Sequence, residues 1–595
     1  MRNFNIIDIE TFNENGRFVP YCICVILNEK RISIYGSEVI KRLIEMFEKL
    51  KINETFYAHN LTFDGSIIIE NMGTTGKLKG IFFKSNIYEI TIWTKNFKVV
   101  LKCSYKMFPL SLKKIGQLIK EKEKIEFPHE FAKKENLYYI GDKPRNEKIK
   151  DWNFKKEVID YCFNDCEITK KMLEKVTRSM NIQEKEIFLQ SRSISSLSLN
   201  TFKKKFNNFN LETKMDIDKD EMIRNGFYGG RCEVFGNRYA DEKIFHFDFS
   251  GMYAEIMKEE FFFNNIEIEK SNEISEGGFY KVDLVSDNMD IPVLPFKEKK
   301  DGKLIFPNGR WTGTYWYEEL KLFEKEGGVV DKIHYKIKLK NKEKIFEKFV
   351  ENYNVLRNES EVENVFWKLF INSIYGRLGM GPNFEETLLI QDEEEYKKIR
   401  KEKEILKESI INKIKIITIE KEKKIDTVES NVSIAAQITS KARIKLFKAF
   451  KEVIKNEGRI LYTDTDSIFA AFKKNVLWEK HGEVYWDGNK VDTVIDDAIF
   501  ALPKGYALLI KKKEIVKIKG FRRNSISFHE FEKTFKNNNE LTLKEINFKK
   551  SNFSLKFEEI EKKIQLNSYD KRVFDKDKNK TKALVIKTNN NFDPT

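Results

Sequence analysis

Cysteine is scarce in this chain, and long apolar runs are absent. The six cysteines show no CxxC pair and no repeated metal-ligand spacing, at positions 22, 24, 103, 162, 166 and 232. This spacing argues against a disulfide framework and a structural zinc, and it predicts reduced thiols in an intracellular compartment. No stretch reaches the roughly 18 uncharged apolar residues of a membrane-spanning helix, and the run at 499–510 is broken by Lys504. We therefore expect a soluble protein with no membrane partner.

A secretory signal and internal repeats are also missing. In the first residues, MRNFNIIDIE, Asp8 interrupts the apolar run, so we expect no export. No repeat of about 20 to 50 residues is visible, which excludes solenoids and propellers. Positive charge is present instead: a net charge of +15 favours a polyanionic partner. Charge alone does not choose between nucleic acid and an anionic membrane surface, but the lack of a spanning segment weakens the membrane interpretation. At about 100 to 200 residues per domain, the 595 residues should form roughly three to five domains.

The pattern of apolar residues predicts mixed α and β structure. Strands at 5–9 and 21–27 are followed by an amphipathic helix at 38–50. A polar loop at 141–146 leads to a helix at 155–176. We expect the first domain to end soon after this helix.

The rest of the chain contains further strands and helices and one segment without a clear assignment. A strand is predicted at 244–249, one or two long helices at 345–378, and an amphipathic helix at 431–453. Residues 382–428 are dense in Glu, Lys and Ile. A coiled-coil arm, a β-hairpin and a solvated linker are all compatible with that composition.

Two aspartates flank one threonine in the segment Tyr462-Thr-Asp464-Thr-Asp466-Ser467. An extended strand or a tight hairpin places their carboxylates on one side, where their repulsion is costly unless a cation neutralises it. Two Mg²⁺ ions about 3.5 to 4 Å apart can activate a 3′-hydroxyl and stabilise a leaving pyrophosphate. Asp248, which ends a strand, is the best candidate for a third ligand. Taken alone, however, such a turn is more often an ordinary surface turn.

A mixed stripe of residues occupies one face of the long helix predicted at 345–378. Lys368, Asn372 and Tyr375 follow one another at helical spacing, with Gly376 beside them. A cation for a triphosphate, an aromatic plane for a base pair and a glycine for close approach fit together chemically. Without its partners, this stripe is equally compatible with an ordinary structural role.

A second group of acids lies in the N-terminal part. Asp8 and Glu10 alternate along a predicted strand, so both carboxylates project from one face, as a two-metal nuclease requires. Asp64 adds a third acid. Tyr161 and Asp165 share a helical face, so the phenol can orient a water molecule beside a metal-bound aspartate. A strand with an ordinary polar face is the alternative for the first pair.

These motifs, in this order, resemble those of family B DNA polymerases. Residues 248–253 resemble motif A, 368–376 motif B and 462–467 motif C. The resemblance implies a palm with Asp248 and Asp466 as the surest metal ligands and Asp464 as the third carboxylate. It further implies an incoming-nucleotide pocket formed by Tyr253, Lys368, Asn372 and Tyr375. A ring at Tyr253 would collide with a 2′-hydroxyl, so deoxynucleotides should be preferred.

The N-terminal acids resemble the three motifs of the 3′–5′ proofreading exonuclease joined to these polymerases. The resemblance implies that Asp8, Glu10, Asp64 and Asp165 bind metal and that Tyr161 assists. It also offers contacts to the 3′ end of DNA: Thr11, Asn60, Phe63, Ser111, Leu112 and Lys122. By contrast, His59 is interpreted as structural, and Cys162 and Cys166 as packing residues, because two thiols are not a zinc site.

Long segments between motifs A and B and between motifs B and C are similar to those of protein-primed polymerases of phages and linear plasmids. In that subgroup two inserts, TPR1 and TPR2, contact a separate terminal protein and help to enclose DNA during strand displacement. Residues 227–231 resemble the subgroup's YxGG/A element, which implies DNA contacts by Phe227, Tyr228, Gly229 and Gly230; an ordinary glycine turn is the alternative. Lys504 and Tyr506 resemble the KxY motif that holds the primer terminus.

The expected fold is multidomain α/β, with a ribonuclease H-like exonuclease domain and a right-hand polymerase. The expected domains are the exonuclease (1–190), the palm (191–259 and 430–530), TPR1 (260–343), the fingers (344–379), TPR2 (380–429) and the thumb (531–595). We expect a monomeric DNA-directed DNA polymerase with 3′–5′ exonuclease activity that uses dNTPs and two Mg²⁺ ions per site, with Mn²⁺ as an alternative. Its partners would be primer-template DNA and a separate terminal protein, in a host cytoplasm or an organelle. Two alternatives stay open: a family B polymerase that extends nucleic-acid primers, and a nuclease or DNA-binding protein on a decayed scaffold.

Overall fold

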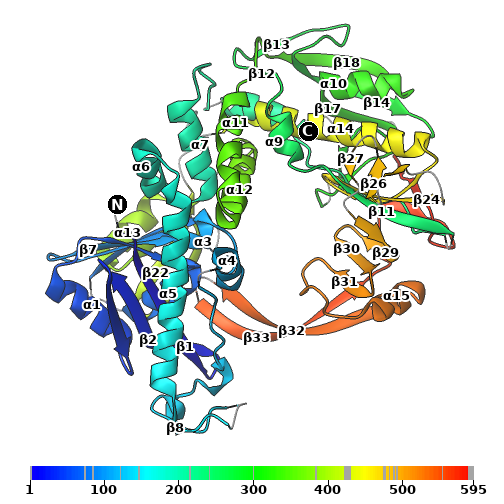
Figure 1. Ribbon diagram of the computed structural model, residues 1–595. Helices are drawn as coiled ribbons and strands as arrows, with labels where there is room; N and C mark the ends of the chain where they lie inside the picture. Colours follow the sequence, from blue (N-terminus) through cyan, green and yellow to red (C-terminus); the bar gives the residue numbers. More distant parts are fainter. Residues whose placement is uncertain are drawn as a thin grey trace.

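The computed structural model forms two lobes joined at two places. Figure 1 shows an N-terminal lobe in blue and cyan and a second lobe in green to red, connected by helices on one side and by a long hairpin on the other. The structure describes residues 3–72, 76–83, 86–120, 122–144, 148–213, 216–239, 241–298, 301–381, 385–420, 430–473, 478–480, 483–486, 489–490, 493–551 and 554–586. Parts of the predicted loop at 141–146 and of the segment 382–428 lie outside these residues.

The N-terminal lobe is built on a seven-stranded sheet in the order β3-β2-β1-β4-β7-β6-β5. Its strands are β1 (Asn5–Glu14), β2 (Arg17–Leu27), β3 (Lys30–Tyr35), β4 (Thr55–Ala58), β5 (Lys77–Phe83), β6 (Asn86–Trp93) and β7 (Lys98–Cys103). The predicted strands at 5–9 and 21–27 are therefore confirmed.

Helices cover both faces of this sheet, which explains why β2 reads as one continuous apolar run. Ile23 and Val25 pack with α1 (Val39–Leu50) and α2 (Leu61–Met72). Cys22 and Cys24 point to the other face, where α5 (Phe154–Arg178) lies. The predicted helices at 38–50 and 155–176 are confirmed as α1 and α5.

A bundle of helices connects the two lobes. It contains α6 (Ile182–Gln190), α7 (Ile194–Lys205), α11 (Glu347–Val355) and α12 (Glu361–Leu378). The predicted helical region at 345–378 is thus two helices, because Ser360 caps a new helix by accepting a hydrogen bond from Glu363 N at 3.3 Å. A single apolar core continues from α5 through α7 and α12 into α14 (Val432–Lys455), so the bundle is a packed connection between the lobes.

The second lobe is organised around a five-stranded sheet, here called the central sheet, in the order β10-β23-β24-β11-β28. Its strands are β10 (Cys232–Val234), β11 (Glu242–Asp248), β23 (Arg459–Asp464), β24 (Ser467–Lys473) and β28 (Thr493–Ile495). Apolar residues of α14 pack on the central sheet, which confirms the helix predicted at 431–453.

The segment between α9 (Met252–Ile256) and α11 folds as a separate sheet in the order β13-β18-β14-β17-β36. Its first four strands are β13 (Glu267–Glu269), β14 (Gly278–Ser286), β17 (Asn308–Trp316) and β18 (Val329–Lys338). The fifth, β36 (Val585–Ile586), comes from the C-terminal part of the chain. Helix α10 (Tyr317–Lys325) packs in the apolar core that this sheet shares with α14.

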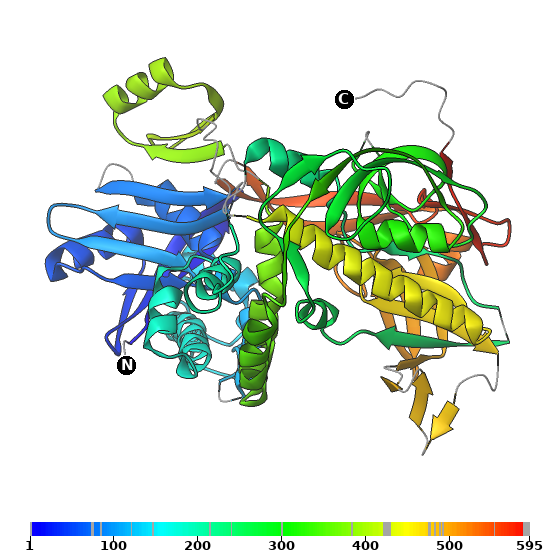
Figure 2. The same cartoon turned by 90° about the horizontal axis from the view of Figure 1, so that it is seen from above.

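The ambiguous segment 382–428 folds largely as β structure where it is described. It forms a three-stranded sheet, β20 (Glu385–Ile390), β21 (Ile405–Ile411) and β22 (Ile414–Glu420), with helix α13 (Glu393–Glu402). Gln391 joins this unit to the N-terminal lobe, since its amide group bonds Leu78 N at 2.9 Å and Gly76 O at 3.0 Å. Figure 2 shows the unit lying against that lobe. Among the three alternatives, the β-hairpin is the one that the structure resembles.

The C-terminal part first forms a sheet of β29 (Asp497–Leu502), β30 (Gly505–Ile510) and β31 (Lys513–Lys517), which packs with α15 (Phe528–Lys536). A long hairpin of β32 (Glu540–Ser551) and β33 (Ser554–Gln565) then extends to α2 and β2 of the N-terminal lobe (Figure 1). One apolar cluster contains both Val516 and Phe531, on the two sides of the boundary expected at 530. The domain boundaries given above remain predictions.

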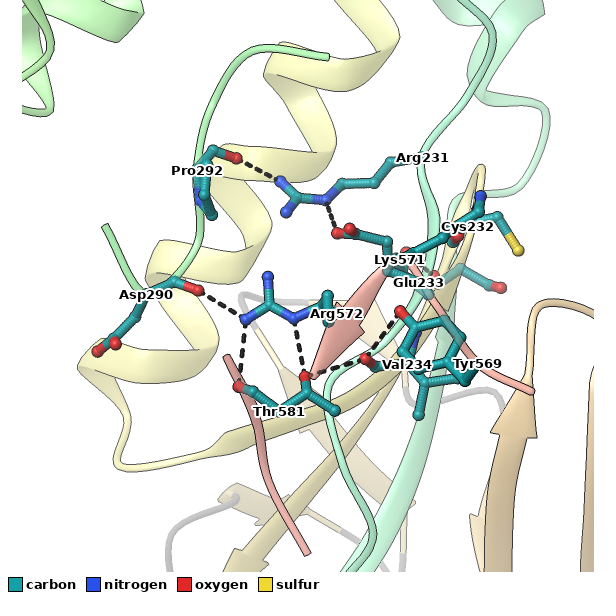
Figure 3. Close-up of polar contacts among 12 residues, drawn as sticks. Arg231, Cys232, Glu233, Val234, Asp290, Pro292, Tyr569, Lys571, Arg572 and Thr581 are labelled. Carbon is teal, nitrogen blue, oxygen red and sulfur yellow. Dashed lines mark hydrogen bonds and ion pairs between the residues drawn. The ribbon is translucent and has the colours of Figure 1, made fainter. Parts of the chain in front are cut away.

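After the hairpin the chain returns to the central sheet (Figure 3). Tyr569 Oη accepts a hydrogen bond from Val234 N at 3.0 Å. Arg572 Nη2 donates to Asp290 O at 2.8 Å, and Thr581 Oγ1 donates to Val234 O at 3.1 Å. The C-terminal residues therefore hold β10, the strand beside the predicted catalytic turn. Across the described ranges, every helix is too short or too polar to span a bilayer.

Candidate active sites

The aspartate motif forms the tight turn of the hairpin between β23 and β24. Thr465 adopts a left-handed backbone conformation with φ of 70°, and its N–H donates to Arg231 O at 2.7 Å. A Cβ on Gly230 would lie 2.7 Å from Thr465 Cγ2, so only glycine permits this approach. The glycine pair was expected to allow close approach of template phosphates; the structure shows that Gly230 already serves to seat the turn.

Asp248 comes to this turn from the neighbouring strand. It ends β11 opposite Ser467 of β24, and Phe249 N donates to Asp466 O at 2.8 Å. Burial, and then repulsion from Asp248, raises the pKa of Asp466, whereas the positive charge of Lys368 lowers it. These two acids and Lys368 therefore act on one another electrostatically, although they belong to three elements far apart in the sequence.

Asp464 has a different environment. Lys504 Nζ lies 3.1 Å from Asp464 Oδ2, and Lys504 N donates to Tyr462 Oη at 2.9 Å. Tyr462 in turn stacks on Phe500, with ring centroids 5.1 Å apart. Because a lysine already neutralises Asp464, this arrangement favours Asp248 and Asp466 as direct metal ligands and Asp464 as a supporting carboxylate. Tyr506 packs against the same aromatic group.

The predicted nucleotide pocket is partly assembled from two helices. Tyr253 of α9 stacks on Tyr375 of α12, with ring centroids 4.5 Å apart and planes 16° from parallel. In the described part of the chain, Asn372 Oδ1 is buried without a hydrogen-bond partner, and Lys368 is exposed on the same helix. The structure thus brings both tyrosines together and leaves a buried acceptor and an exposed cation beside them.

Tyr228 requires a correction to the predicted DNA contacts. Its side chain is only 7% exposed, and its ring stacks on Tyr315 with centroids 5.3 Å apart, so it is unavailable for stacking on DNA. Arg443 Nη1 fixes the same loop by donating to Tyr228 O at 2.7 Å and Gly229 O at 3.0 Å. Phe227 is half-buried against Gly379 at the end of α12. Phe227, Gly229 and Gly230 remain predicted contacts.

The N-terminal acids meet at a cavity of about 740 Å³. Asp8 and Glu10 project into it from β1, Asp64 from α2 and Asp165 from α5. The predicted DNA contacts Thr11, Asn60, Phe63 and Leu112 also line this cavity. Ser111 instead caps α4 (Leu112–Ile119), accepting from Lys114 N at 3.3 Å. Alternation along β1 and packing of α2 and α5 on one face of it therefore produce a four-carboxylate site.

Burial dominates the electrostatics of this cavity. It raises the pKa of Asp8 to about 7, with repulsion from Asp165 as the next cause. Burial also raises the pKa values of Glu10 and Asp64 well above their usual range, and repulsion from Asp8 adds to both. Within the described residues, Asp165 Oδ1 is buried and has no hydrogen-bond partner. Divalent cations would neutralise these four acids and would also provide a partner for Asp165 Oδ1. The residues of the cavity therefore fit metal ions.

Three residues at this cavity were missed by the sequence predictions. Lys124, rather than Lys122, forms the ion pair with Asp165, and its Nζ lies 4.6 Å from the centre of the Tyr161 ring. Lys122 pairs with Glu167 at 2.7 Å. His129 packs edge-on against Tyr161, and Arg522 of the second lobe also lines the cavity. Lysine alternates with glutamate at 120–124, and this pattern could have identified Lys124 as a candidate. The sequence around Arg522 contains no such signal.

His59 also lines this cavity, but both of its ring nitrogens already have partners, which favours the structural role that was expected. Its Nδ1 lies 3.0 Å from Ser104 Oγ and its Nε2 lies 2.8 Å from Leu110 O. Burial lowers the pKa of the imidazole to about 4, so the ring is neutral near pH 7. Cys162 and Cys166 are buried in the apolar core, as expected. The fold also brings Cys22 and Cys24 to Cys162, although the spacing of these cysteines gives no metal motif.

Several known DNA polymerases are similar to this chain in sequence or structure. Residues 48–456 match the family described as DNA polymerase type B, organellar and viral. A probable DNA polymerase of Podospora anserina is 24% identical over 550 residues, covering 80% of this chain and 44% of that protein. A DNA-directed DNA polymerase of enterobacteria phage PRD1 is 24% identical over 509 residues, covering 80% of this chain and 77% of that protein. The chain spans about half the length of the fungal relatives that it matches.

The fold is shared with Phi29 DNA polymerase, solved in complex with primer-template DNA and incoming nucleotide. The two structures align with a TM-score of 0.71 at 17% identity, covering 95% of this chain and 100% of the other.

Proposed function

The chain belongs to the organellar and viral type B DNA polymerases, and on that premise we propose that it synthesises DNA on a template and proofreads it with a 3′–5′ exonuclease. One observation carries the proposal: Asp248 at the end of β11 meets Asp466 in the turn between β23 and β24, beside Lys368 and the stacked Tyr253 and Tyr375. The fold, with its exonuclease, palm, fingers and thumb regions and two inserts, is that of the aligned polymerase structure.

In nucleotidyl transfer, Asp248 and Asp466 would hold two Mg²⁺ ions, with Mn²⁺ as an alternative. When bound, such ions lower the pKa of a primer 3′-hydroxyl and neutralise the charge on a departing pyrophosphate. Lys368 would bind the triphosphate of the incoming dNTP, while Tyr253 and Tyr375 seat its sugar and base. Lys504, which pairs with Asp464, would orient this carboxylate and hold the primer terminus.

In proofreading, Asp8, Glu10, Asp64 and Asp165 would hold the divalent ions. The phenol of Tyr161 stays neutral, because burial and the neighbouring acids raise its pKa, and it would orient the attacking water. The cavity residues Thr11, Asn60, Phe63 and Leu112 would hold the unpaired 3′ end. Lys124, close to both Asp165 and Tyr161, would stabilise the negative charge that develops on the phosphate.

A primer-extension assay tests this proposal. The full chain is incubated with labelled primer-template DNA, Mg²⁺ and dNTPs, and then with single-stranded DNA alone. We expect extension in the first reaction and shortening from the 3′ end in the second. Degradation without any extension would instead support the nuclease on a decayed scaffold.

We also propose that replication starts on a separate terminal protein, within a host cytoplasm or an organelle, and proceeds with strand displacement. Support comes from the inserts, residues 260–343 and 380–429, which contain separate sheets outside the central sheet. Transfer of a labelled deoxynucleotide to a candidate terminal protein is the test. If the chain extends nucleic-acid primers but never labels its true partner protein, the nucleic-acid-primed alternative is correct.

A further inference from the structure

Four cysteines gather beside the carboxylates of the N-terminal cavity. In the antiparallel pair of β1 and β2, Asp8 lies opposite Cys24 and Glu10 opposite Cys22. Opposite residues in such a pair share one face of the sheet. Helix α5 covers this face and adds Cys162 and Cys166, and all four side chains are 0% exposed. The thiols are therefore neighbours of the acids within one core.

Three of these thiols are spaced closely enough to bind one ion. The Sγ atoms of Cys22, Cys24 and Cys162 lie within 4.8 Å of one another. Zinc binds thiolates at about 2.3 Å, which places two sulfurs on a common ion about 3.8 to 4.0 Å apart. Side-chain rotations that move the sulfur atoms by about 1 Å or less would therefore bring them to the spacing of a zinc site. Buried cysteine also serves as a small apolar residue, and packing alone is the competing explanation.

Cys162 links this thiol group to the acids. Its Sγ donates to Asp8 Oδ2 at 3.4 Å and to Asp8 O at 3.5 Å. The ligand atoms of Asp8, Glu10 and Cys162 also lie within 4.8 Å of one another. One carboxylate oxygen of Asp8 thus lies next to Cys162 Sγ, one of the three sulfurs, and a rotation of the Asp8 side chain would bring it in as the fourth ligand of a tetrahedral set.

We propose that Cys22, Cys24 and Cys162, with Asp8 as the fourth ligand, form a site for a thiophilic divalent cation of the Zn²⁺ and Cd²⁺ class, and that its occupation shuts off proofreading. Thiolates select soft cations, whereas Mg²⁺ prefers oxygen. The inhibitory part rests on the proposed function, because it requires Asp8 to serve the exonuclease. An ion on the sulfurs would hold Asp8 away from the ions of the cavity.

Synthesis should be insensitive to this ion, because no comparable group of thiols lies at Asp248 and Asp466 among the residues that the structure describes. The nearest cysteine of that site is Cys232, whose Sγ lies 3.4 Å from Tyr462 Oη. A single thiol provides one ligand where a structural site of this class needs four. If all variants also carry Cys232→Ser, this single ligand is absent from every protein that is compared.

Binding is tested with Cd²⁺ as the probe, by the ultraviolet absorption of cadmium thiolates in the full chain. We expect one Cd²⁺ per chain in the wild type and loss of the band in the Cys22→Ser/Cys24→Ser double variant. Cys166→Ser is the matched control, since Cys166 lies on the same helix as Cys162, is equally buried and lies outside the group of three. Absence of the band in the wild type, or equal loss in the control, would overturn the site. Melting curves and primer extension establish that the variants are folded.

The functional consequence is tested on single-stranded DNA in Mg²⁺ with one equivalent of Cd²⁺. Degradation by the wild type should fall by about tenfold or more, which is the scale of effects caused by disturbing the groups around a metal site. Degradation by the double variant should stay nearly constant, and so should primer extension by both proteins. Equal inhibition of wild type and double variant would overturn the inhibitory role. If the wild type degrades no DNA even without Cd²⁺, the proposed exonuclease fails instead, and the absorption band still decides whether the thiol site exists.

Discussion

The two candidate sites place their acids in opposite surroundings. In the N-terminal cavity the acids are packed together, and burial raises the pKa values of Asp8, Glu10 and Asp64. In the central sheet Asp248 is exposed and Asp464 is paired with Lys504. In the first site Lys124 pairs with Asp165, but burial outweighs its charge at Asp8 and Glu10, whereas in the second site Lys504 pairs directly with Asp464. Proofreading should therefore depend more strongly on pH than synthesis does.

The largest expected effect is the loss of DNA synthesis in Asp466→Asn, which would show that the synthesis site works separately from the exonuclease site. Asp466→Asn should lower primer extension by about 10³-fold or more, because it removes a charged ligand from ions that provide several kcal/mol of stabilisation. Degradation of single-stranded DNA should be unchanged, and both reactions are followed on labelled oligonucleotides.

Asp165→Asn is the mirror variant and should abolish degradation while sparing extension. Asp165 lies in the N-terminal core, so its effect should stay within that lobe. If either variant lost both activities in parallel, the separation of the two sites would be contradicted.

A second test concerns the support of the catalytic turn. Arg231 and Glu233 form an ion pair at 2.7 Å in which both side chains are buried. Arg231→Met would leave the Glu233 charge without its partner, and such losses cost about 3 to 5 kcal/mol. We expect a lower midpoint in urea unfolding, with extension more affected than degradation, because Arg231 O also holds Thr465.

Lys344→Met is the control for this variant. It breaks an ion pair with Glu347 at 2.7 Å that lies at the surface, and exposed pairs contribute little to stability. A change in the urea midpoint as large as that of Arg231→Met would refute the claim that burial makes the difference.

Sugar selection should show a smaller effect. Tyr253→Val would remove the ring expected to meet a 2′-hydroxyl, so incorporation of ribonucleotides relative to deoxynucleotides should rise about tenfold to a hundredfold. Single-nucleotide extension with paired rNTP and dNTP substrates measures this ratio. Leu369→Val, a change on α12 that retains both stacked tyrosines, is the control. An unchanged ratio in Tyr253→Val would disprove the steric role of the ring.

The smallest expected effect is the pH dependence. Because the pKa of Asp8 is raised to about 7, its carboxylate is mostly protonated at pH 6 and mostly ionised at pH 8. At low Mg²⁺ the exonuclease rate should rise about tenfold across this interval, and higher Mg²⁺ should move the rise to lower pH by favouring the ionised form. A flat profile at low Mg²⁺, or a steeper one for extension, would contradict the contrast between the sites.

The raised pKa of Asp8 also affects the stability of the folded chain. An acid whose pKa is raised on folding favours the folded state in its protonated form. Its contribution is therefore greatest below the ordinary pKa of an aspartate, and it is lost as the pH rises toward about 7. Added Mg²⁺ should restore stability above that pH, since it binds the ionised carboxylates of the folded chain.

Much of both sites could be predicted from the sequence because short spacings determine direction within one element. Alternation along a strand places Asp8 and Glu10 on one face, and a four-residue spacing on a helix places Tyr161 beside Asp165. The order of the motifs likewise predicted that Tyr253 and Tyr375 share a pocket, and the structure stacks them. The roles of these residues in catalysis and binding remain proposals.

Other features depended on packing between elements. The sequence offered Lys122 as a contact, but the path of the chain beside α5 brings Lys124 to Asp165. Tyr228 appears in a DNA-binding motif, yet it packs against Tyr315 of an insert. The sequence of residues 382–428 was compatible with three structures. The described part of this segment forms a three-stranded sheet, and Gln391 joins it to the N-terminal lobe by a hydrogen bond.

The sequence by itself determined the family, the order of the motifs and the acids of each site, since these depend on residue type and local periodicity. Only the tertiary structure decided which distant groups meet: Asp464 with Lys504, Arg522 with the N-terminal cavity, and three cysteines with one another. The physical reason is that such contacts depend on how sheets and helices pack, and no spacing along the chain encodes that packing directly.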